Sequence, residues 1–393
     1  MEYFYLMNEY DKVLKFGFEV TELGNHYEIC DVYLPDQLPL WIRDSFGSEA
    51  LFDWVERRVI PVNRHHMEAV LGAINLENKF DVLRYSHAMS LNDTFWIQEE
   101  NENLNYYEIN LYDNKFDEAL GWIAFTGLPS DISRHLSTPE LTTGGALPKY
   151  WQKISFDDII LCKGGTEGYS NAGYEPFGEI VAYLISKRIK INNIPVSFEF
   201  RNKKPVSVTK LFTSRKFGLL SANQYLIYNF PKYKYVSLER MLEAMEKDLP
   251  SVKPFYDMCF FDYLIENGDR HLNNWGFLVN NKTMRIDSFA PLWDNGASLM
   301  FDNSEMYHNE FDFASFSIRY DFVKTCEYKE EYISLCRRLV ASVNSGELAA
   351  ECSDMLKDYT PYRNRVQPAL EFVKSRCEEY IKCAESGVLR LKK

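Results

Sequence analysis

Two carboxylates and one amide stand at informative spacings within residues 260–301, and this stretch constrains the fold more than any other. Asp269 follows a helix-breaking Asn-Gly pair, and Asn274 comes five residues later. Asp294 lies beyond two short apolar segments that are typical of the arms of a hairpin. The stretch therefore predicts a helix, a tight turn, a β-hairpin and a loop, with polar side chains in the turn and the loop.

This order of polar residues is the one that phosphoryl transfer requires. A carboxylate orients the attacking hydroxyl and accepts its proton, while an amide oxygen and a second carboxylate hold Mg²⁺. We therefore expect Asp269 to be the catalytic base, Asn274 and Asp294 to bind the metal, and Arg270 to brace the loop. Each motif alone is more often a simple turn, and their combination indicates an ATP-dependent phosphotransferase. Asp287, at the end of a strand, remains an alternative metal ligand to Asp294.

A glycine pair and a strand lysine further upstream predict where the nucleotide binds. Gly144 and Gly145 let backbone N–H groups approach phosphate oxygens, although an ordinary hairpin turn between two strands explains the same pair. Residues 158–163 are typical of a buried strand that ends in Lys163. In kinases a strand lysine after the glycine-rich loop contacts the α- and β-phosphates, so Lys163 is the candidate for that role.

A helix is predicted to begin near Pro176, because proline suits the first helical position and an apolar stripe follows it. The stripe consists of Phe177, Ile180, Val181, Leu184 and Ile185. Glu175 and Glu179 are both candidates to pair with Lys163. An interaction of either carboxylate with the helix dipole is the structural alternative.

The run NGDRHLNNWGF, followed by APLWDNG, resembles the HipA family of bacterial serine/threonine kinases, which are toxins of type II toxin–antitoxin modules. In that family a DRHxxN run supplies the catalytic aspartate and a metal-binding asparagine, and a P-x-[YF]-D run supplies the second metal ligand. The resemblance implies Asp269 as the base and Asn274 and Asp294 as Mg²⁺ ligands, with Trp293 in place of the usual Tyr or Phe. Phosphoinositide kinases also carry GDRHxxN, but Asp-Phe-Gly follows it there and Asp-Ser-Phe stands here.

The resemblance also implies a regulatory site. HipA-type kinases carry a G-[AV]-Q-x-K run at the glycine-rich loop, and residues 145–149 of this chain are GALPK, with Leu147 at the position of the glutamine. Family members autophosphorylate a serine just before those glycines, which expels the loop and inactivates the enzyme. Thr142 and Thr143 occupy the equivalent positions here.

Two more assignments rest on the resemblance and on position in the chain. The family pattern favours Glu175 over Glu179 as the partner of Lys163. The hinge that binds adenine through its backbone is expected at residues 209–212. The predicted nucleotide site thus consists of Thr142, Thr143, Gly144, Gly145, Lys163, Glu175, Thr209, Lys210, Leu211 and Phe212.

Composition restricts the partners and the compartment. The formal net charge of −13 opposes direct binding to nucleic acid or to an anionic membrane. The eight cysteines show no CxxC spacing, which is typical of reduced thiols in the cytoplasm rather than of a zinc site. We find neither a secretory signal nor an apolar run long enough for a membrane helix.

We predict an α+β fold with a two-lobed, protein-kinase-like core behind an N-terminal accessory α/β domain. The expected domains are residues 1–140, then a small β-rich lobe at 141–212 and a large helical lobe at 213–393. Strands are expected at residues 15–21 and 27–33 of the accessory domain. Residues 128–140, rich in Ser, Pro, Thr and Asp, are typical of a linker.

The predicted activity is transfer of the γ-phosphoryl group of ATP, with Mg²⁺, to a hydroxyl group. The resemblance alone implies that the acceptor is a serine or threonine of a protein, and it points to a helix-turn-helix antitoxin as a partner. Two alternatives remain: a kinase that acts on a lipid or a small molecule, and a non-enzymatic corepressor that binds such an antitoxin.

Overall fold

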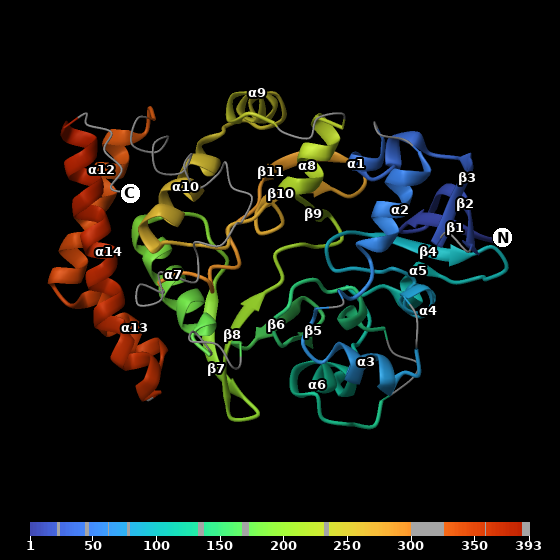
Figure 1. Ribbon diagram of the computed structural model, residues 1–393, viewed down its shortest axis with the longest axis horizontal. Coiled ribbons are helices and arrows are strands. Elements are labelled where there is room, and N and C mark those ends of the chain that lie inside the picture. Colours follow the sequence, from blue (N-terminus) through green and yellow to red (C-terminus); the bar gives the residue numbers. More distant parts are fainter. Residues whose placement is uncertain are drawn as a thin grey trace. The chain divides into compact units, whose positions relative to one another are not determined.

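The computed structural model has a mixed α and β architecture with several sheets (Figure 1). It divides into two compact units, each built from three segments of the chain. The first unit is Met1–Lys163, Lys210–Ser237 and Gly276–Ala290, and the second is Gly164–Thr209, Leu238–Trp275 and Pro291–Lys393. The structure describes residues 1–21, 24–43, 47–61, 63–76, 79–132, 137–166, 173–231, 236–299, 326–357 and 359–386. These units interleave along the sequence, whereas the three expected domains are contiguous, and the domain boundaries stay a prediction.

An antiparallel sheet in the order β3-β2-β1-β4 begins the first unit. The strands expected at residues 15–21 and 27–33 are confirmed within β2 (Asp11–Thr21) and β3 (Gly24–Val32). We did not predict β1 (Glu2–Asn8) or β4 (Phe95–Glu99). The Asn8 side chain at the end of β1 donates a buried hydrogen bond of 2.8 Å to the carbonyl of Asn281. This bond therefore joins the first and the last of the three chain segments that make up the unit.

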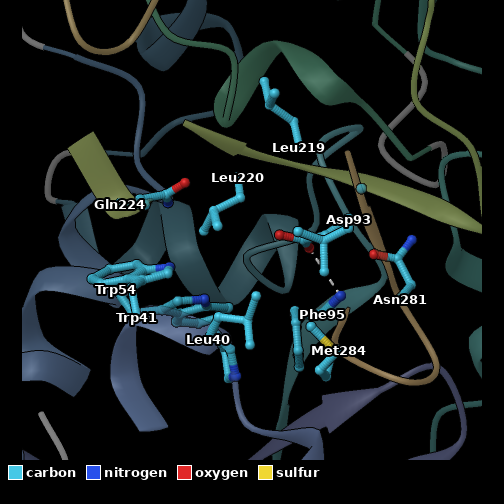
Figure 2. A pocket seen from close by; sticks show the side chains of 13 residues that line it. Leu40, Trp41, Trp54, Asp93, Phe95, Leu219, Leu220, Gln224, Asn281 and Met284 are labelled. Atoms are coloured by element: carbon cyan, nitrogen blue, oxygen red, sulfur yellow. Dashed lines mark hydrogen bonds between the residues drawn. The ribbon is translucent and has the colours of Figure 1, made fainter. Parts of the chain in front are cut away.

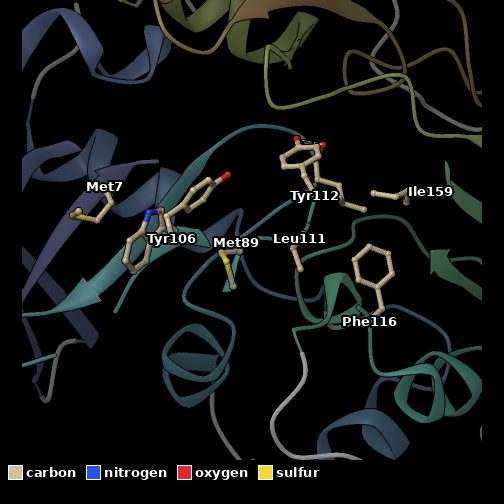
Figure 3. Close-up of a cluster of buried hydrophobic side chains, with 9 residues drawn as sticks. Met7, Met89, Tyr106, Leu111, Tyr112, Phe116 and Ile159 are labelled. Atoms are coloured by element: carbon tan, nitrogen blue, oxygen red, sulfur yellow. Dashed lines mark hydrogen bonds between the residues drawn. The ribbon is translucent and has the colours of Figure 1, made fainter. Parts of the chain in front are cut away.

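A cluster of buried side chains connects this sheet to later parts of the first unit (Figure 3). Met7 and Trp96 come from the sheet, and Ile159 comes from the strand that carries Lys163. The cluster consists of Met7, Met89, Leu91, Trp96, Tyr106, Leu111, Tyr112, Phe116 and Ile159. Residues on both sides of position 140 thus share one hydrophobic core.

Strands β5 (Lys149–Ser155) and β6 (Asp158–Lys163) form an antiparallel hairpin in which Lys149 pairs with Lys163. The predicted strand ending in Lys163 is confirmed. The expectation of two strands around the glycine pair is wrong on one side, because a short 3-10 turn at Pro139–Leu141 precedes the glycines. The linker prediction is also wrong at its end, because the residues from Thr138 to Thr142 are buried.

The hairpin expected after the catalytic turn is confirmed as β10 (Gly276–Asn280) and β11 (Arg285–Phe289). Strand β9 (Phe217–Ser221) pairs with the other edge of β10, which gives a three-stranded sheet in the order β11-β10-β9. The helices of the first unit are α1 (Leu40–Arg43), α2 (Ser48–Glu56), α3 (Met67–Ala73), α4 (Lys79–Ser86), α5 (Tyr106–Ile109), α6 (Glu118–Thr126) and α8 (Ala222–Asn229).

Helices dominate the second unit. Helix α7 (Glu175–Ile189) begins with Pro176 in its first turn, and every residue of the predicted apolar stripe is buried, so this prediction is confirmed. The hairpin of β7 (Val196–Arg201) and β8 (Lys204–Lys210) follows it. The other helices among the described residues of this unit are α9 (Leu238–Asp248), α10 (Lys253–Ile265), α12 (Lys329–Asn344), α13 (Glu347–Met355) and α14 (Thr360–Ser386).

Aromatic rings hold α10 against the C-terminal helices. Helix α14 packs against α10, α12 and α13 (Figure 1). Phe260 of α10 stacks on Tyr332 of α12 with 4.2 Å between ring centroids, and it meets Tyr380 of α14 edge-on at 5.3 Å. Because α10 leads directly into the predicted catalytic turn, this packing also fixes the position at which the turn begins. No helix in the described ranges is both long and apolar enough to cross a membrane.

Replacing Phe260, which is fully buried, with alanine should therefore destabilise the second unit. We expect a loss of about 3–5 kcal/mol in the free energy of unfolding, because the truncation leaves a cavity between three helices. Urea unfolding followed by circular dichroism measures this change. Tyr107→Ala, at a side chain that is 65% exposed, is the matched control and should change the stability by less than about 0.5 kcal/mol.

Candidate functional site

The turn that carries Asp269 is built by the end of α10. Glu266 caps the helix with a φ of +51°, and the backbone N–H of Asn267 donates to the carbonyl of Asp262. The Oδ1 atom of Asn267, a fully buried residue, then accepts a hydrogen bond of 3.1 Å from the N–H of Asp269. Asp269 is held in a fixed backbone position while remaining only half-buried.

Asn274 is joined to Asp269 by a direct hydrogen bond. Its Nδ2 group donates to the backbone carbonyl of Asp269 at 2.8 Å, and its own N–H donates to the carbonyl of His271 at 2.9 Å. Because the amide nitrogen is used in this way, the Oδ1 atom is the part of the amide that remains for a cation. The five-residue spacing read from the sequence thus corresponds to one closed turn.

The loop that carries Asp294 is packed against the start of α7. Asp294 has a φ of +57°, a conformation in which aspartate is one of the few tolerated side chains. The next residue, Asn295, is fully buried, and its backbone N–H donates to the carboxylate of Glu179 at 3.0 Å. One carboxylate oxygen of Glu179 thus binds this loop, and the pairing of Glu179 with Lys163 stays a prediction. Because Asn295 follows Asp294 directly, this hydrogen bond also restrains the backbone of Asp294.

Arg270 joins the turn that carries Asp269 to the loop that carries Asp294. Its guanidinium group, only 2% exposed, forms a buried ion pair with Asp262 at 3.1 Å. It also donates to the backbone carbonyls of Asn274, at 2.8 Å, and of Trp293. A fourth partner is the Oδ1 atom of Asn295, at 2.5 Å. One side chain therefore connects both neighbours of Asp294 to the segment between Asp269 and Asn274.

These contacts agree with the expected role of Arg270 as a brace, and they add residues that the sequence reasoning missed. Asp262 lies inside the apolar run FFDYLI of α10, and an aspartate on a buried helix face is a signal that could have revealed its buried ion pair. Asn295 offered no such signal, because its burial depends on α7. Asp269, Asn274 and Asp294 thus belong to one unit, and one hydrogen-bonded network links the segments that carry them.

The donor atoms of this network suit a hard divalent cation. Mg²⁺ prefers oxygen ligands and is usually held by one or two carboxylates together with phosphate oxygens. Asn274 and Asp294 would supply an amide oxygen and a carboxylate. Among the described residues, no group of three or more His, Cys, Asp or Glu side chains could hold a metal. Phosphate oxygens of a bound nucleotide would add ligands to such a cation.

Asp287, the alternative ligand, has different surroundings. It lies in β11, in the first unit, and its side chain is exposed. The hydroxyl of Ser288 donates to its carboxylate at 3.1 Å. The choice between Asp294 and Asp287 as the metal ligand stays a prediction.

The predicted phosphate-binding residues lie in a well-anchored loop of the first unit. The hydroxyl of Thr142 donates to the carbonyl of Met89 at 2.6 Å, and the hydroxyl of Thr143 donates to that of Pro139 at 2.7 Å. Gly145 has a φ of +85°, which favours glycine. Gly144 and Gly145 are exposed, as a loop that binds phosphate must be.

The other predicted nucleotide residues fall in both units. Lys163 ends β6 and is buried. The carboxylate of Glu175, which opens α7, accepts a hydrogen bond from the N–H of Thr166 at 3.1 Å, so the pairing of Glu175 with Lys163 stays a prediction. In the expected hinge at 209–212, the N–H of Leu211 donates to the carbonyl of Ile159 and is therefore not available to adenine.

A small pocket lies elsewhere in the first unit (Figure 2). Its volume is about 30 Å³, and Trp41, Trp54 and Phe95 are among the residues that line it. None of the predicted site residues lines it. Asp93, in its wall, accepts hydrogen bonds from the N–H of Phe95 and from Arg58. A space of this size holds one or two water molecules and not a nucleotide.

The chain is similar to a known family over more than half of its length. The family model described as the HipA-like C-terminal domain matches residues 141–354. The chain belongs to the HipA-like family. The matched range includes the glycine-rich loop, Lys163 and the whole network around Arg270. No curated protein sequence shows significant similarity to this HipA-like chain.

Two solved structures resemble the HipA-like chain. One is HipA of Shewanella oneidensis MR-1, determined as part of a toxin–antitoxin system in complex with HipB and its operator DNA. It has a TM-score of 0.60 and 14% sequence identity over 98% of each chain, which shows a shared fold. The other is the Helicobacter pylori proinflammatory kinase CtkA, with a TM-score of 0.44 and 17% identity over 61% of this chain and 95% of that one.

Gly178 allows α7 to approach the Asp294 loop closely, and its replacement by alanine tests this contact. An added Cβ atom would lie 2.7 Å from the carbonyl oxygen of Gly296. We expect Gly178→Ala to lower the free energy of unfolding by about 1–3 kcal/mol, because neither backbone can yield easily. In Gly72→Ala the new methyl group meets nothing within 4 Å, and the protein should gain up to about 1 kcal/mol from helix propensity. Thermal and urea unfolding compare the two; equal effects would contradict the contact.

Proposed function

We propose that the HipA-like chain is an ATP- and Mg²⁺-dependent serine/threonine protein kinase. The observation that carries the proposal is the Arg270 network, which ties the Asp269–Asn274 turn to the loop of Asp294. The order of these residues meets the requirements of phosphoryl transfer. Membership in the HipA-like family supports the same activity. The choice of a protein serine or threonine as acceptor rests on the family resemblance.

Asp269 would act as the base. Asn267 holds the backbone of this half-buried residue, and its carboxylate would accept the proton of an acceptor hydroxyl as the oxygen attacks the γ-phosphorus. Asn274 and Asp294 would hold Mg²⁺, which when bound draws negative charge from the phosphate oxygens. Arg270 keeps these groups at their mutual positions and does not itself face a substrate, because its guanidinium is buried and bound by protein groups.

The nucleotide would be bound by residues upstream. We assign the triphosphate to Gly144, Gly145 and Lys163, and adenine to the backbone of residues 209–212. The N–H of Leu211 is engaged, so the remaining backbone groups of that segment would have to serve. Under this proposal residues 141–212 make the small lobe and residues 213–393 the large lobe, with residues 1–140 as an accessory domain. The eight cysteines show no CxxC spacing, which supports an assignment to the reducing cytoplasm.

Substitution of the proposed base, Asp269, and of the proposed metal ligand, Asp294, tests the proposal. Asp269→Asn should reduce phosphoryl transfer by about 10²–10⁴-fold, the usual contribution of a general base, and leave the fold intact. Asp294→Asn should reduce it by at least about 10²-fold and raise the Mg²⁺ concentration needed for half-maximal rate. Transfer of ³²P from γ-labelled ATP to a protein acceptor, followed at several Mg²⁺ concentrations, measures both effects.

Asp287→Asn is the matched control, because it is the same substitution at the alternative ligand. We expect it to retain the wild-type rate within about twofold, as an exposed residue outside the network should. A loss of activity in Asp287→Asn with Asp294→Asn unaffected would reverse the assignment of the metal ligand. Full activity of Asp269→Asn would reject the proposed mechanism.

We also propose that Thr142 or Thr143 is a self-inhibitory phosphorylation site. The hydroxyl of Thr143 both donates to Pro139 and accepts from the indole N–H of Trp151 at 2.9 Å, and Thr142 is buried. A phosphate on either oxygen would break these bonds and drive the loop out of its place. Phosphopeptide mapping after incubation with Mg-ATP should find phosphate on one of them, with a parallel fall in activity. Two unmodified threonines during continued turnover would contradict this.

A second candidate function is that of an antitoxin-binding corepressor. The relative from Shewanella oneidensis was solved with HipB and operator DNA, which favours a DNA-binding antitoxin as partner for this chain as well. The net charge of −13 makes DNA contact through such a partner more favourable than direct contact. Growth inhibition by the wild type but not by Asp269→Asn would show that the kinase activity matters in cells. Phosphoinositide acceptors assayed beside protein acceptors would identify a lipid kinase.

A further inference from the structure

We propose that Arg64, paired with Glu140, is a positioning residue that sets the glycine-rich loop (residues 142–148) in its phosphate-binding conformation. The inference rests on the proposed function and adds to it a role for the N-terminal region. Arg64 lies between α2 and α3, in the part of the chain expected to be an accessory domain. The loop itself comes some eighty residues later.

Arg64 and Glu140 form a completely enclosed ion pair. The guanidinium lies 2.5 Å from the carboxylate, and the side chains are 0% and 1% exposed. The other carboxylate oxygen of Glu140 accepts a hydrogen bond of 2.7 Å from the N–H of Trp151. Arg64 also donates to the carbonyl of Lys149 at 3.1 Å. The pair therefore binds the chain on both sides of the loop.

The same segment binds carbonyl groups within the loop. Arg64 donates to the carbonyl of Thr143 at 3.1 Å, and the backbone N–H of His65 donates to that of Ala146 at 2.9 Å. The ammonium group of Lys149 donates to the carbonyl of Gly144 at 2.7 Å. Three carbonyl oxygens that would repel a phosphate are thus occupied by donors from the protein.

Peptide geometry then orients the other side of the loop. In a trans peptide the C=O and N–H groups point in opposite directions, and the described chain contains no cis peptide. Because the carbonyls of Thr143, Gly144 and Ala146 are held by protein donors, the N–H groups of Gly144, Gly145 and Leu147 point away from those donors. Successive N–H groups of this kind form an anion-binding concavity. Gly144 and Gly145 are exposed there, so a phosphate could reach them.

The chemistry of the pair explains why arginine is needed. Burial raises the pKa of Glu140, and the neighbouring guanidinium opposes that rise, so each charge depends on the other. Arg64 contacts the Glu140 carboxylate and three backbone carbonyls through the planar fork of its guanidinium. Lysine keeps the positive charge but cannot reproduce that geometry. The loop would then lose its anchors on one side while the unit keeps its net charge.

Arg64→Lys in the full-length chain tests the inference. We expect the KM for ATP to rise about tenfold or more while kcat stays within about threefold, because the loop binds phosphate and Asp269 performs the chemistry. Arg58→Lys is the matched control. Arg58 forms a partly buried arginine–carboxylate pair in the same unit, with Asp93, and its hydrogen bonds go to Asp93 and to the carbonyl of Ala88. The Arg58→Lys variant should lose a comparable amount of free energy of unfolding and keep the wild-type KM for ATP.

Hydrogen exchange without nucleotide gives a readout that does not depend on activity. The N–H groups of His65, Thr142 and Trp151 are bonded within or beside the pair, and peptides that contain them should exchange faster in Arg64→Lys than in wild type or Arg58→Lys. Unchanged exchange, an unchanged KM, or an equal rise of KM in Arg58→Lys would overturn the inference. If the wild type fails to turn over ATP, the proposed function is wrong, and the exchange of these amides still decides whether Arg64 orders the loop.

Discussion

The buried guanidinium of Arg270 is the interaction on which the candidate catalytic region depends. Burying a charge is costly unless it is paired and hydrogen-bonded, and Arg270 meets that condition with one carboxylate, two backbone carbonyls and one amide oxygen. Its partners come from α10, from the turn and from the loop around Asp294. The guanidinium is fully hydrogen-bonded only when all of these partners are in place. The ordering of the three segments is therefore cooperative.

The first unit uses the same device around its glycine-rich loop. Irregular segments lack the regular partners of helices and strands, yet their backbone carbonyls still need donors when they are buried. Arg64 supplies those donors to residues 143 and 149, and Glu140 supplies the compensating charge. In each unit an enclosed arginine–carboxylate pair anchors the backbone of a loop that we propose to be functional, without using the side chains proposed to react.

Local patterns predicted much of the fold, and long-range pairing explains the failures. The apolar period around Pro176 identified α7, and alternation and turn residues identified β6, β10 and β11. Glu140 was assigned to a linker because its neighbours are polar, and nothing nearby shows that Arg64, 76 residues away, encloses it. The spacing of Asp269, Asn274 and Asp294 was visible in the sequence, but Glu179 and Asn295 enter the network only through helix packing. The region at 300–325 lies outside the described residues.

The interleaving of the two units has a consequence for biosynthesis. The bond between Asn8 and Asn281 joins the first and last segments of the first unit, and the pairing of β9 with β10 joins its second and third segments. A nascent polypeptide leaving the ribosome cannot complete these contacts until about three quarters of it has been translated. Until then apolar strands made early remain without their final neighbours. Such a protein depends on chaperones during translation more than one whose domains follow each other along the chain.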